Sequence, residues 1–122
     1  MAAKDIVIVD DDQWFADSLQ ATLRRHGYVA RLAHNALEAI ERINEQLPMV
    51  IVADFFMPGP NAMVLLHELQ SYSDTADIPV VLCTNSAADI ALDLVEPYGV
   101  KVVLDKTLMQ PDDIVAAVRR VT

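Results

Sequence analysis

Residues 6–12 read IVIVDDD, a short run of β-branched apolar residues that ends abruptly in three carboxylates. Four apolar runs of similar length follow along the chain, at Tyr28–Ala33, Met49–Ala53, Pro79–Thr84 and Val100–Leu104. Most of these runs are continuously apolar rather than alternating, which is typical of strands covered on both faces. The sequence therefore predicts five strands in the interior of the molecule.

The segments between these runs carry apolar residues at helical spacing. Asn35 can cap one helix, with Glu38 reaching back to it, and Ser86 with Asp89 repeats that spacing before another. A turn at Pro58-Gly59-Pro60 precedes the third helix. The predicted inward faces of the first four helices are Phe15, Leu19, Thr22, Leu23 and His26; Leu37, Ile40, Ile43 and Leu47; Leu65, Leu66, Leu69 and Tyr72; and Ile90, Leu94 and Val95.

Strand and helix thus alternate five times, with connections of a few residues. This order favours parallel pairing through right-handed crossovers, with helices on both faces of the sheet. We expect an α/β fold of three layers, αβα, around a five-stranded parallel sheet. The sequence of 122 residues has no low-complexity tract and no change of composition, so we expect residues 1–122 to form one domain.

Charge and composition argue against several function classes. Acids outnumber bases 18 to 9, for a formal net charge of −9, which argues against nonspecific binding to nucleic acid or to an anionic membrane. No apolar run approaches the ~18 residues of a membrane span, and Met1–Asp5 shows no signal-peptide pattern. The lone Cys83 fits a reducing compartment. We therefore expect a cytoplasmic protein without a direct nucleic-acid or membrane partner.

Chemically complementary polar residues follow four of the five strands. Asp10–Asp12 end the first strand, Asp54 the third, Thr84 the fourth and Lys106 the fifth. Ligands of open parallel sheets bind outside the carboxyl ends of the strands, so we expect these side chains to converge. Neighbouring carboxylates need a counter-charge, and a site made of oxygen ligands suits Mg²⁺ better than zinc.

A metal ion, an ammonium and a hydroxyl around Asp54 are typical of phosphoryl chemistry, with Asp54 as the nucleophile. Taken singly, each residue has a plainer interpretation: a solvated acidic loop, a turn aspartate, a strand threonine and a surface lysine. The coincidence of four strand ends favours the phosphoryl interpretation. No Gly-rich phosphate loop is present, so nucleotide-binding folds of this architecture lose support.

The sequence resembles the receiver domain of bacterial two-component response regulators over essentially its whole length. The resemblance rests on Val9–Asp12, on Asp54 followed by Met57-Pro58-Gly59, on Thr84 and on Lys106. It implies a flavodoxin-like (βα)5 topology and a phosphorylatable signalling module. Such a module is not an enzyme in the usual sense, because it catalyses only its own aspartyl phosphorylation and dephosphorylation.

The resemblance also implies a donor and a metal site. Asp54 would accept a phosphoryl group from a histidine kinase or a phosphotransfer protein. Asp11, Asp54 and the Phe56 carbonyl would bind Mg²⁺, or Mn²⁺ in its place, while Asp10 would act mostly through water and Asp12 would be peripheral. The signal would pass to a downstream protein target or to a fused output domain outside this chain, and the sequence leaves both possibilities open.

Thr84 and Lys106 match the family's pair that binds the phosphoryl oxygens and couples the modification to a change of conformation. Three positions depart from the family pattern. Val103 stands at the switch position where an aromatic ring is common, so the readout cannot use a ring. Thr107 replaces a proline that often follows a cis bond, and since a cis bond before another residue costs ~2.5–4 kcal/mol, we expect a trans bond here. Asn61-Ala62 replaces Asp-Gly in the loop after the acceptor.

Two other functions stay open at this stage. One is a receiver-fold docking module that binds a partner without phosphorylation, for which the altered residues Ala62 and Thr107 are the motive. The other is a phosphatase with an aspartate nucleophile, which would use Asp10 and Asp12 as its acid pair. The phosphatase ranks last, because Gln13-Trp14 follows the acids where such enzymes need Thr or Val.

Overall fold

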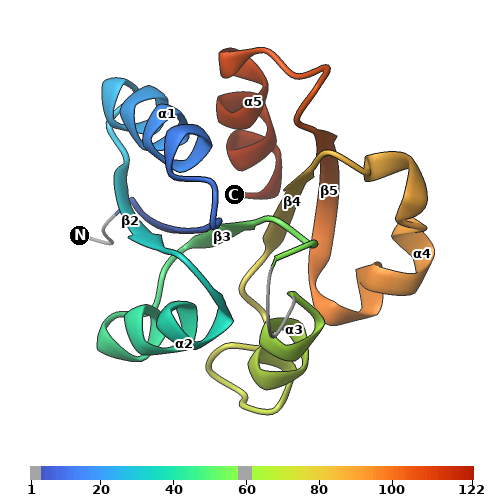
Figure 1. The fold of residues 1–122 in the computed structure, drawn as a ribbon. Coiled ribbons are helices and arrows are strands. Elements are labelled where there is room, and N and C mark those ends of the chain that lie inside the picture. Colours follow the sequence, from blue (N-terminus) through green and yellow to red (C-terminus); the bar gives the residue numbers. More distant parts are fainter. Residues whose placement is uncertain (1–3, 58–61) are drawn as a thin grey trace.

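A computed structural model describes residues 4–57 and 62–122. Its sheet has the strand order β2-β1-β3-β4-β5, and every neighbouring pair is parallel (Figure 1). The strands are β1 (Asp5–Val9), β2 (Val29–Ala33), β3 (Val50–Ala53), β4 (Val80–Thr84) and β5 (Val100–Asp105). This order is that of flavodoxin-like folds, so the predicted fold class is confirmed.

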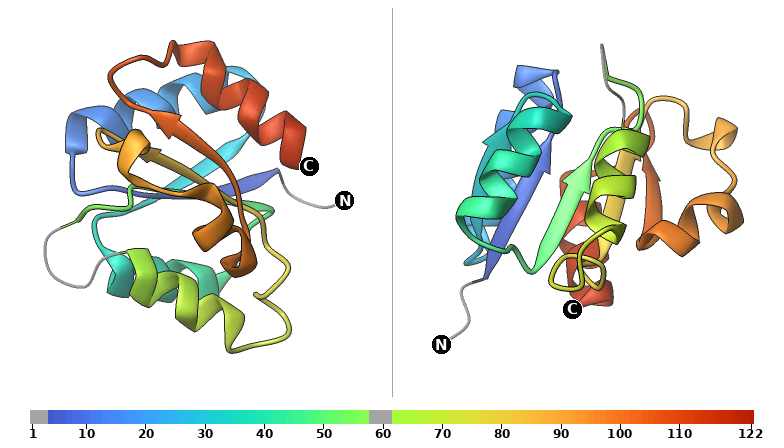
Figure 2. Two further views of the ribbon diagram at one scale, coloured as in Figure 1. Left: turned by 90° about the vertical axis from the view of Figure 1, so that its right-hand side faces the viewer. Right: turned by 90° about the horizontal axis from the view of Figure 1, so that it is seen from below.

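Helices cover both faces of this sheet, as the two views of Figure 2 show. On one face lie α1 (Gln13–Arg25) and α5 (Pro111–Val121); on the other lie α2 (Ala36–Glu45), α3 (Ala62–Gln70) and α4 (Leu92–Val95). Short 3₁₀ helices at Ala87–Asp89 and Glu96–Tyr98 flank α4. In the described part of the chain, none of the helices has the length and apolar character needed to cross a bilayer.

The apolar core has two halves, one on each face of the sheet. Val7 and Val9 of β1 belong to the half beneath α2 and α3, whereas Ile6 and Ile8 belong to the half beneath α1 and α5. All residues of β1, β3 and β4 are buried, and apart from Asp5 and Thr84 they are apolar. Full burial of each such side chain contributes about 1.5–3 kcal/mol, so these three strands form a rigid base for the residues that follow them.

The predicted inward face of α2 is partly wrong. The helix buries Ala36, Ala39 and Ile43, whereas Leu37 and Leu47 are exposed. Alanine side chains are short, so they let the backbone of α2 pack close to the sheet, and Leu47 lies beyond the end of the helix.

The predicted fourth helix is broken into three short pieces. Ser86 makes no side-chain capping bond, and Leu94, expected to face inward, is 71% exposed. Val95 is buried and Ile90 is half-buried against the core, as predicted. Ile90 and Ala91 have extended backbone and separate the first piece from α4. Pro97 has no amide hydrogen to donate and its ring clashes with the preceding turn of a continuing α-helix, so it ends α4.

Two further residues predicted to face inward lie beyond helix ends. His26 follows the end of α1 and Tyr72 follows the end of α3, and both are exposed. Gly27, with φ +88°, turns the chain away after α1, since this left-handed backbone region costs glycine little. The predicted turn at Pro58-Gly59-Pro60, and Asn61 after it, fall outside the described residues.

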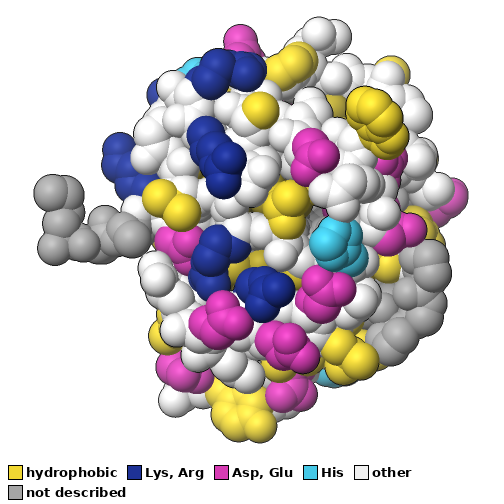
Figure 3. Space-filling model, turned by 60° about the vertical axis from the view of Figure 1, so that its left-hand side comes forward, with side chains coloured by type: hydrophobic (Ala, Val, Ile, Leu, Met, Phe, Trp, Pro, Cys, Tyr) yellow, Lys and Arg dark blue, Asp and Glu magenta, His cyan; other side chains and the backbone are white. Residues whose placement is uncertain are grey.

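Charged side chains follow the helix dipoles. Basic pairs close α1 (Arg24, Arg25) and α5 (Arg119, Arg120), where they face the negative ends of the helices. Figure 3 shows Lys and Arg side chains gathered over part of one face, bordered by Asp and Glu.

At the edge of the sheet, the Gln20 amide donates to the carbonyl of Ala30 in β2, at 2.8 Å.

Candidate functional site

The carboxyl edge of the sheet brings together residues from three separate strands. Asp10 follows β1, Asp54 follows β3 and Lys106 follows β5. The backbone amide of Asp54 donates to the carbonyl of Val9 at 2.9 Å, and that of Asp10 donates to the carbonyl of Ala33 at 3.0 Å. The ladder between parallel strands therefore fixes the two carboxylates side by side.

Lys106 lies between these two acids. Its Nζ is 2.7 Å from Oδ2 of Asp10 and 3.0 Å from Oδ2 of Asp54, and its side chain is 6% exposed. The backbone amide of Lys106 donates to the carbonyl of Thr84 at 3.0 Å, which ties the lysine to the end of β4. The ring of Phe15 lies over the ammonium, with its centroid 4.4 Å from Nζ. One buried cation is thus shared by two carboxylates and an aromatic face.

Burial shifts the pKa values of Asp10 and Lys106. It raises the pKa of Asp10 above its ordinary value, because the Lys106 ammonium only partly offsets the loss of water. Burial alone would lower the pKa of Lys106, but the bonds and charges of Asp10 and Asp54 outweigh it and raise that pKa. Lys106 therefore stays cationic at neutral pH, while the charge of Asp10 is poorly compensated.

The acids form a cluster that fits a hard cation. Asp10, Asp11 and Asp54 each offer a carboxylate oxygen, and these oxygens lie within 4.8 Å of one another. Asp11 is exposed, so the cluster opens to water. Among the described residues, Oδ2 of Asp10 is a buried oxygen without a hydrogen bond, although Lys106 lies at ion-pair distance. A cluster of oxygen ligands, partly open to water and short of positive charge, suits Mg²⁺.

Short-range hydrogen bonds shape the two acidic turns. The amide of Asp12 donates to Oδ1 of Asp10 at 2.9 Å, and Oδ1 of Asp12 accepts from the amide of Phe15 at 3.1 Å. Asp12, peripheral to the expected site, is thus the N-cap of α1. After β3, the amide of Phe56 donates to Oδ1 of Asp54 at 3.2 Å. Asp54 is 7% exposed and Phe56 is 49% exposed, so the Asp54 carboxylate lies beneath the surface beside an open aromatic ring.

The remaining predicted site residues lie around this centre. Thr84 is buried at the end of β4, and its hydroxyl oxygen accepts from the amide of Ser86 at 3.4 Å. Val103 is half-buried in the core beneath α2 and α3. No cis peptide bond occurs among the described residues, so the expected trans bond before Thr107 is confirmed. The Thr107 amide and hydroxyl both donate to Oδ1 of Asp105, which holds the loop after Lys106.

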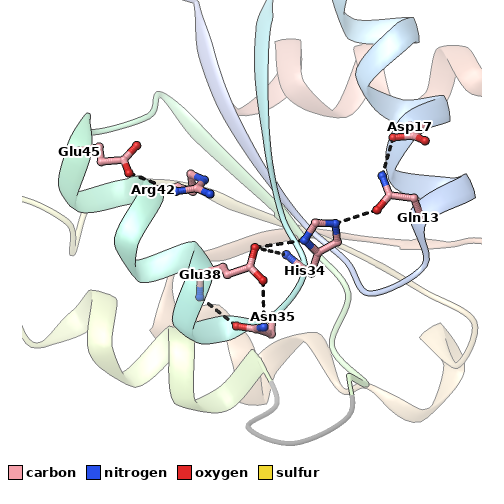
Figure 4. Close-up of polar contacts among 7 residues, drawn as sticks. All are labelled: Gln13, Asp17, His34, Asn35, Glu38, Arg42 and Glu45. Carbon is pink, nitrogen blue, oxygen red and sulfur yellow. Dashed lines mark hydrogen bonds and ion pairs between the residues drawn. The ribbon is translucent and has the colours of Figure 1, made fainter.

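A second polar network, shown in Figure 4, joins the starts of α1 and α2. His34 Nε2 lies 2.7 Å from Oε1 of Gln13, and His34 Nδ1 lies 3.1 Å from Oε1 of Glu38. Gln13 in turn donates to Asp17 at 2.8 Å. Asn35 caps α2 as predicted, by accepting from the amide of Glu38 at 2.9 Å. The spacing of Asn35 and Glu38 predicted the cap, but no local pattern indicated the bridge through His34.

Known proteins share both the sequence pattern and the fold. The family model described as the response regulator receiver domain matches residues 6–119. The response regulator MprA of Mycobacterium ulcerans is 35% identical over 79 residues, which cover 65% of this chain and 33% of that protein. MprA of Mycobacterium avium is 34% identical over 79 residues, covering 65% of this chain and 34% of that protein. This chain therefore matches about a third of the length of these curated relatives.

Solved structures match nearly the whole chain. The chemotaxis protein CheY4 of Vibrio cholerae superposes with a TM-score of 0.87 at 20% identity, covering 99% of this chain and 100% of that one. A sensor protein from Polaromonas sp. JS666 gives 0.89 at 22% identity, covering 98% and 96%. The signal receiver domain of a histidine kinase from Syntrophus aciditrophicus gives 0.82 at 26% identity, covering 98% and 89%. At their low identity, the first two matches support the fold alone.

Proposed function

The chain belongs to the response regulator receiver domain family, and on that basis we propose that it is a signalling module phosphorylated on Asp54. The arrangement that supports this most directly is the acceptor itself: Asp54 is 7% exposed, and its Oδ2 lies 3.0 Å from a buried ammonium. The family places a histidine kinase among the partners. We propose that the kinase, or a phosphotransfer protein, is the donor, that residues 1–122 act as a single receiver domain, and that the module works in the cytoplasm.

In the proposed reaction, a carboxylate oxygen of Asp54 attacks the phosphorus of a phosphohistidine. The new O–P bond forms as the P–N bond breaks, and the departing imidazole keeps the electron pair and takes a proton from water. Oδ1 of Asp54 is engaged by the amide of Phe56, which orients the carboxylate. Oδ2 faces Lys106, so this ammonium lies where negative charge develops on the transferred group.

Asp11, Asp54 and the Phe56 carbonyl would hold Mg²⁺ or Mn²⁺, with Asp10 acting through water. When bound, the ion would supply positive charge next to the phosphoryl oxygens. The three-acid cluster and the uncompensated Oδ2 of Asp10 support this assignment, because the cluster contains more negative charge than Lys106 can neutralise.

Lys106 and Thr84 would carry the signal away from the acceptor. Because the hydroxyl oxygen of Thr84 accepts from Ser86, its hydrogen can be donated to a phosphoryl oxygen. The backbone bond from Lys106 to Thr84 couples any displacement of the lysine to the end of β4. Val103 lacks an aromatic ring at the switch position, so we propose that the conformational change passes through these backbone contacts to a downstream protein or a fused output domain.

The decisive measurement is intact mass after incubation with acetyl phosphate and Mg²⁺. We expect one phosphoryl adduct on the native chain, lost in mild base, absent when Mg²⁺ is chelated and absent in Asp54→Asn. Asp89→Asn, which changes an exposed acid in a 3₁₀ helix, is the matched control and should be labelled normally.

Two other results would replace this proposal. An unlabelled native chain that still binds Mg²⁺ would favour a docking module that recognises its partner without phosphorylation. Repeated turnover of a simple phosphate monoester, dependent on Asp10 and Asp12, would indicate a phosphatase.

A further inference from the structure

The ring of Phe15 has a specific relation to the charge of Lys106. Nζ lies 4.4 Å from the ring centroid, within the range of a cation–π contact. Both partners are largely withdrawn from water: the Lys106 side chain is 6% exposed, and Phe15 is half-buried against the core beneath α1 and α5. Such contacts are strongest where water is excluded.

The two partners differ in how firmly they are held. Phe15 lies in the first turn of α1, where its amide is bonded to the Asp12 cap, and the next residue, Ala16, is buried. Lys106 follows a strand end, and its long side chain can adopt many rotamers. The ring is thus set directly by the helix backbone, whereas the ammonium stands at the end of a long side chain.

The other two contacts of the ammonium depend on the state of the site. Lys106 is paired with Asp10 and Asp54, and both carboxylates change their charge balance when a cation binds or when Asp54 is modified. The Phe15 ring carries no net charge, so its attraction for the ammonium is the same before and after these events. The contact with Phe15 can therefore remain while the ion pairs are exchanged.

We propose that Phe15 is a positioning residue that holds the Lys106 ammonium over the acceptor through its π face. This inference rests on the proposed phosphorylation of Asp54 and assigns Phe15 a part in it. An ammonium held in this way stays in place when Mg²⁺ neutralises the acids. Lys106 then already has the side-chain conformation that contacts the incoming phosphoryl oxygens. If Phe15 served only core packing, any apolar side chain of this size would do. A cation–π role also requires the negative face of the ring, so changing the charge of that face distinguishes the two roles.

The contact itself is tested by NMR, without any phosphorylation. The ε-methylene protons of Lys106 next to the ring should be shifted upfield, and Lys106→Arg assigns their signal. We expect this shift to disappear in Phe15→Leu and to persist in the native protein when Mg²⁺ is added. A signal that is the same in native protein and Phe15→Leu, or a native shift abolished by Mg²⁺, overturns the inference.

The effect on reaction is tested by graded fluorination of Phe15, which weakens the negative face of the ring while nearly preserving its shape. We expect the phosphorylation rate with acetyl phosphate to fall stepwise from one to three ring fluorines, reaching about a tenfold loss, equivalent to about 1.4 kcal/mol. Phe15→Trp should retain most of the rate and Phe15→Leu should not. Equal rates across the fluorinated series would overturn the inference in favour of packing.

The NMR and rate experiments distinguish a failure of the role proposed for Phe15 from a failure of the proposed phosphorylation of Asp54. If the native chain is never labelled on Asp54, the proposed function fails, and the inference fails with it as a statement about the reaction. If labelling succeeds but neither the Lys106 shift nor the rate responds to Phe15, only the role of Phe15 is overturned.

Discussion

Nζ of Lys106 lies 2.7 Å from Oδ2 of Asp10, yet that oxygen has no hydrogen bond within the described part of the molecule. The pair lies in a site that excludes most water, with the Lys106 side chain 6% exposed. Since Lys106 also serves Asp54, the ammonium compensates Asp10 incompletely. Without a bound cation, the buried charge of Asp10 therefore opposes folding.

Asp10→Asn should stabilise the metal-free protein by about 1 kcal/mol. The pKa of Asp10 is raised in the folded state, so the folded protein holds that proton more tightly than the unfolded chain does. The stability contribution of this group is therefore present at low pH and is lost as pH rises through the folded-state pKa. Urea unfolding at neutral pH, with Mg²⁺ chelated, measures the difference.

Mg²⁺ provides the matching test of Asp10. The ion should raise the unfolding midpoint of the native protein more than that of Asp10→Asn, because a ligand that binds only the folded state stabilises it in proportion to its affinity. Asp89→Asn should respond as the native protein does. A lower stability of Asp10→Asn without Mg²⁺ would contradict the assignment of Asp10 as poorly compensated.

Through Glu38, the stability of the protein at acid pH depends on the hydrogen-bond network of Figure 4. Its hydrogen bond with His34 is the main cause of a pKa below the ordinary 4.5. A carboxyl with a lowered folded-state pKa contributes stability above its unfolded pKa and loses it as pH falls through the folded value. Glu38→Gln should therefore be less stable than the native protein near neutral pH, with the difference vanishing well below pH 4.5. Unfolding curves collected across that range by circular dichroism would show it; a constant difference would exclude the mechanism.

Cys83 should be inert in the native protein. Burial raises the pKa of its thiol to about 12, so at pH 8 only about one molecule in ten thousand carries the reactive thiolate. A thiol-specific reagent should label the chain fully in denaturant and scarcely at all without it, and the native rate should follow unfolding. Prompt stoichiometric labelling of folded protein would be incompatible with this environment.

Arg31→Met should destabilise the fold by about 3 kcal/mol, because it leaves the buried Asp5 carboxylate without its partner. Nε of Arg31 donates to Asp5 at 3.0 Å, and its terminal nitrogens donate to the carbonyls of Arg42 and Gln46 at 2.6 and 2.7 Å. Arg24→Met, in the last turn of α1, is the matched control and should change the free energy of unfolding by less than about 0.5 kcal/mol. Equal denaturation midpoints for the two variants would show that the Asp5 pair is dispensable.

The strands were predictable because burial on both faces requires a continuous apolar sequence. Strand β1 begins at Asp5, one residue before the apolar run that predicted it. Asp5 is charged, so local pattern ended the strand at Ile6, whereas Arg31 in β2 supplies the partner that allows Asp5 to be buried. Because these two residues are 26 positions apart, no window of sequence contains the reason.

The contacts of the site also differ in whether the sequence predicts them. The meeting of Asp10, Asp54 and Lys106 follows from parallel strand order, which the sequence indicates well. The position of Phe15 over Lys106 and the bridge from His34 to Gln13 depend on how separate turns pack. Chain spacing carries no signal for such contacts, so the sequence predicted Phe15 on the inward face of the first helix without indicating its contact with Lys106.

The bond from Gln20 to Ala30 bears on self-association. β2 is an outer strand of the sheet, and outer strands offer unpaired peptide groups to which a foreign strand can add, the first step toward fibrils. Here a side chain of α1 occupies one of those carbonyls. Any chain that docked at this point would have to displace an intramolecular partner first, so the molecule's own helix raises the barrier to aggregation along β2.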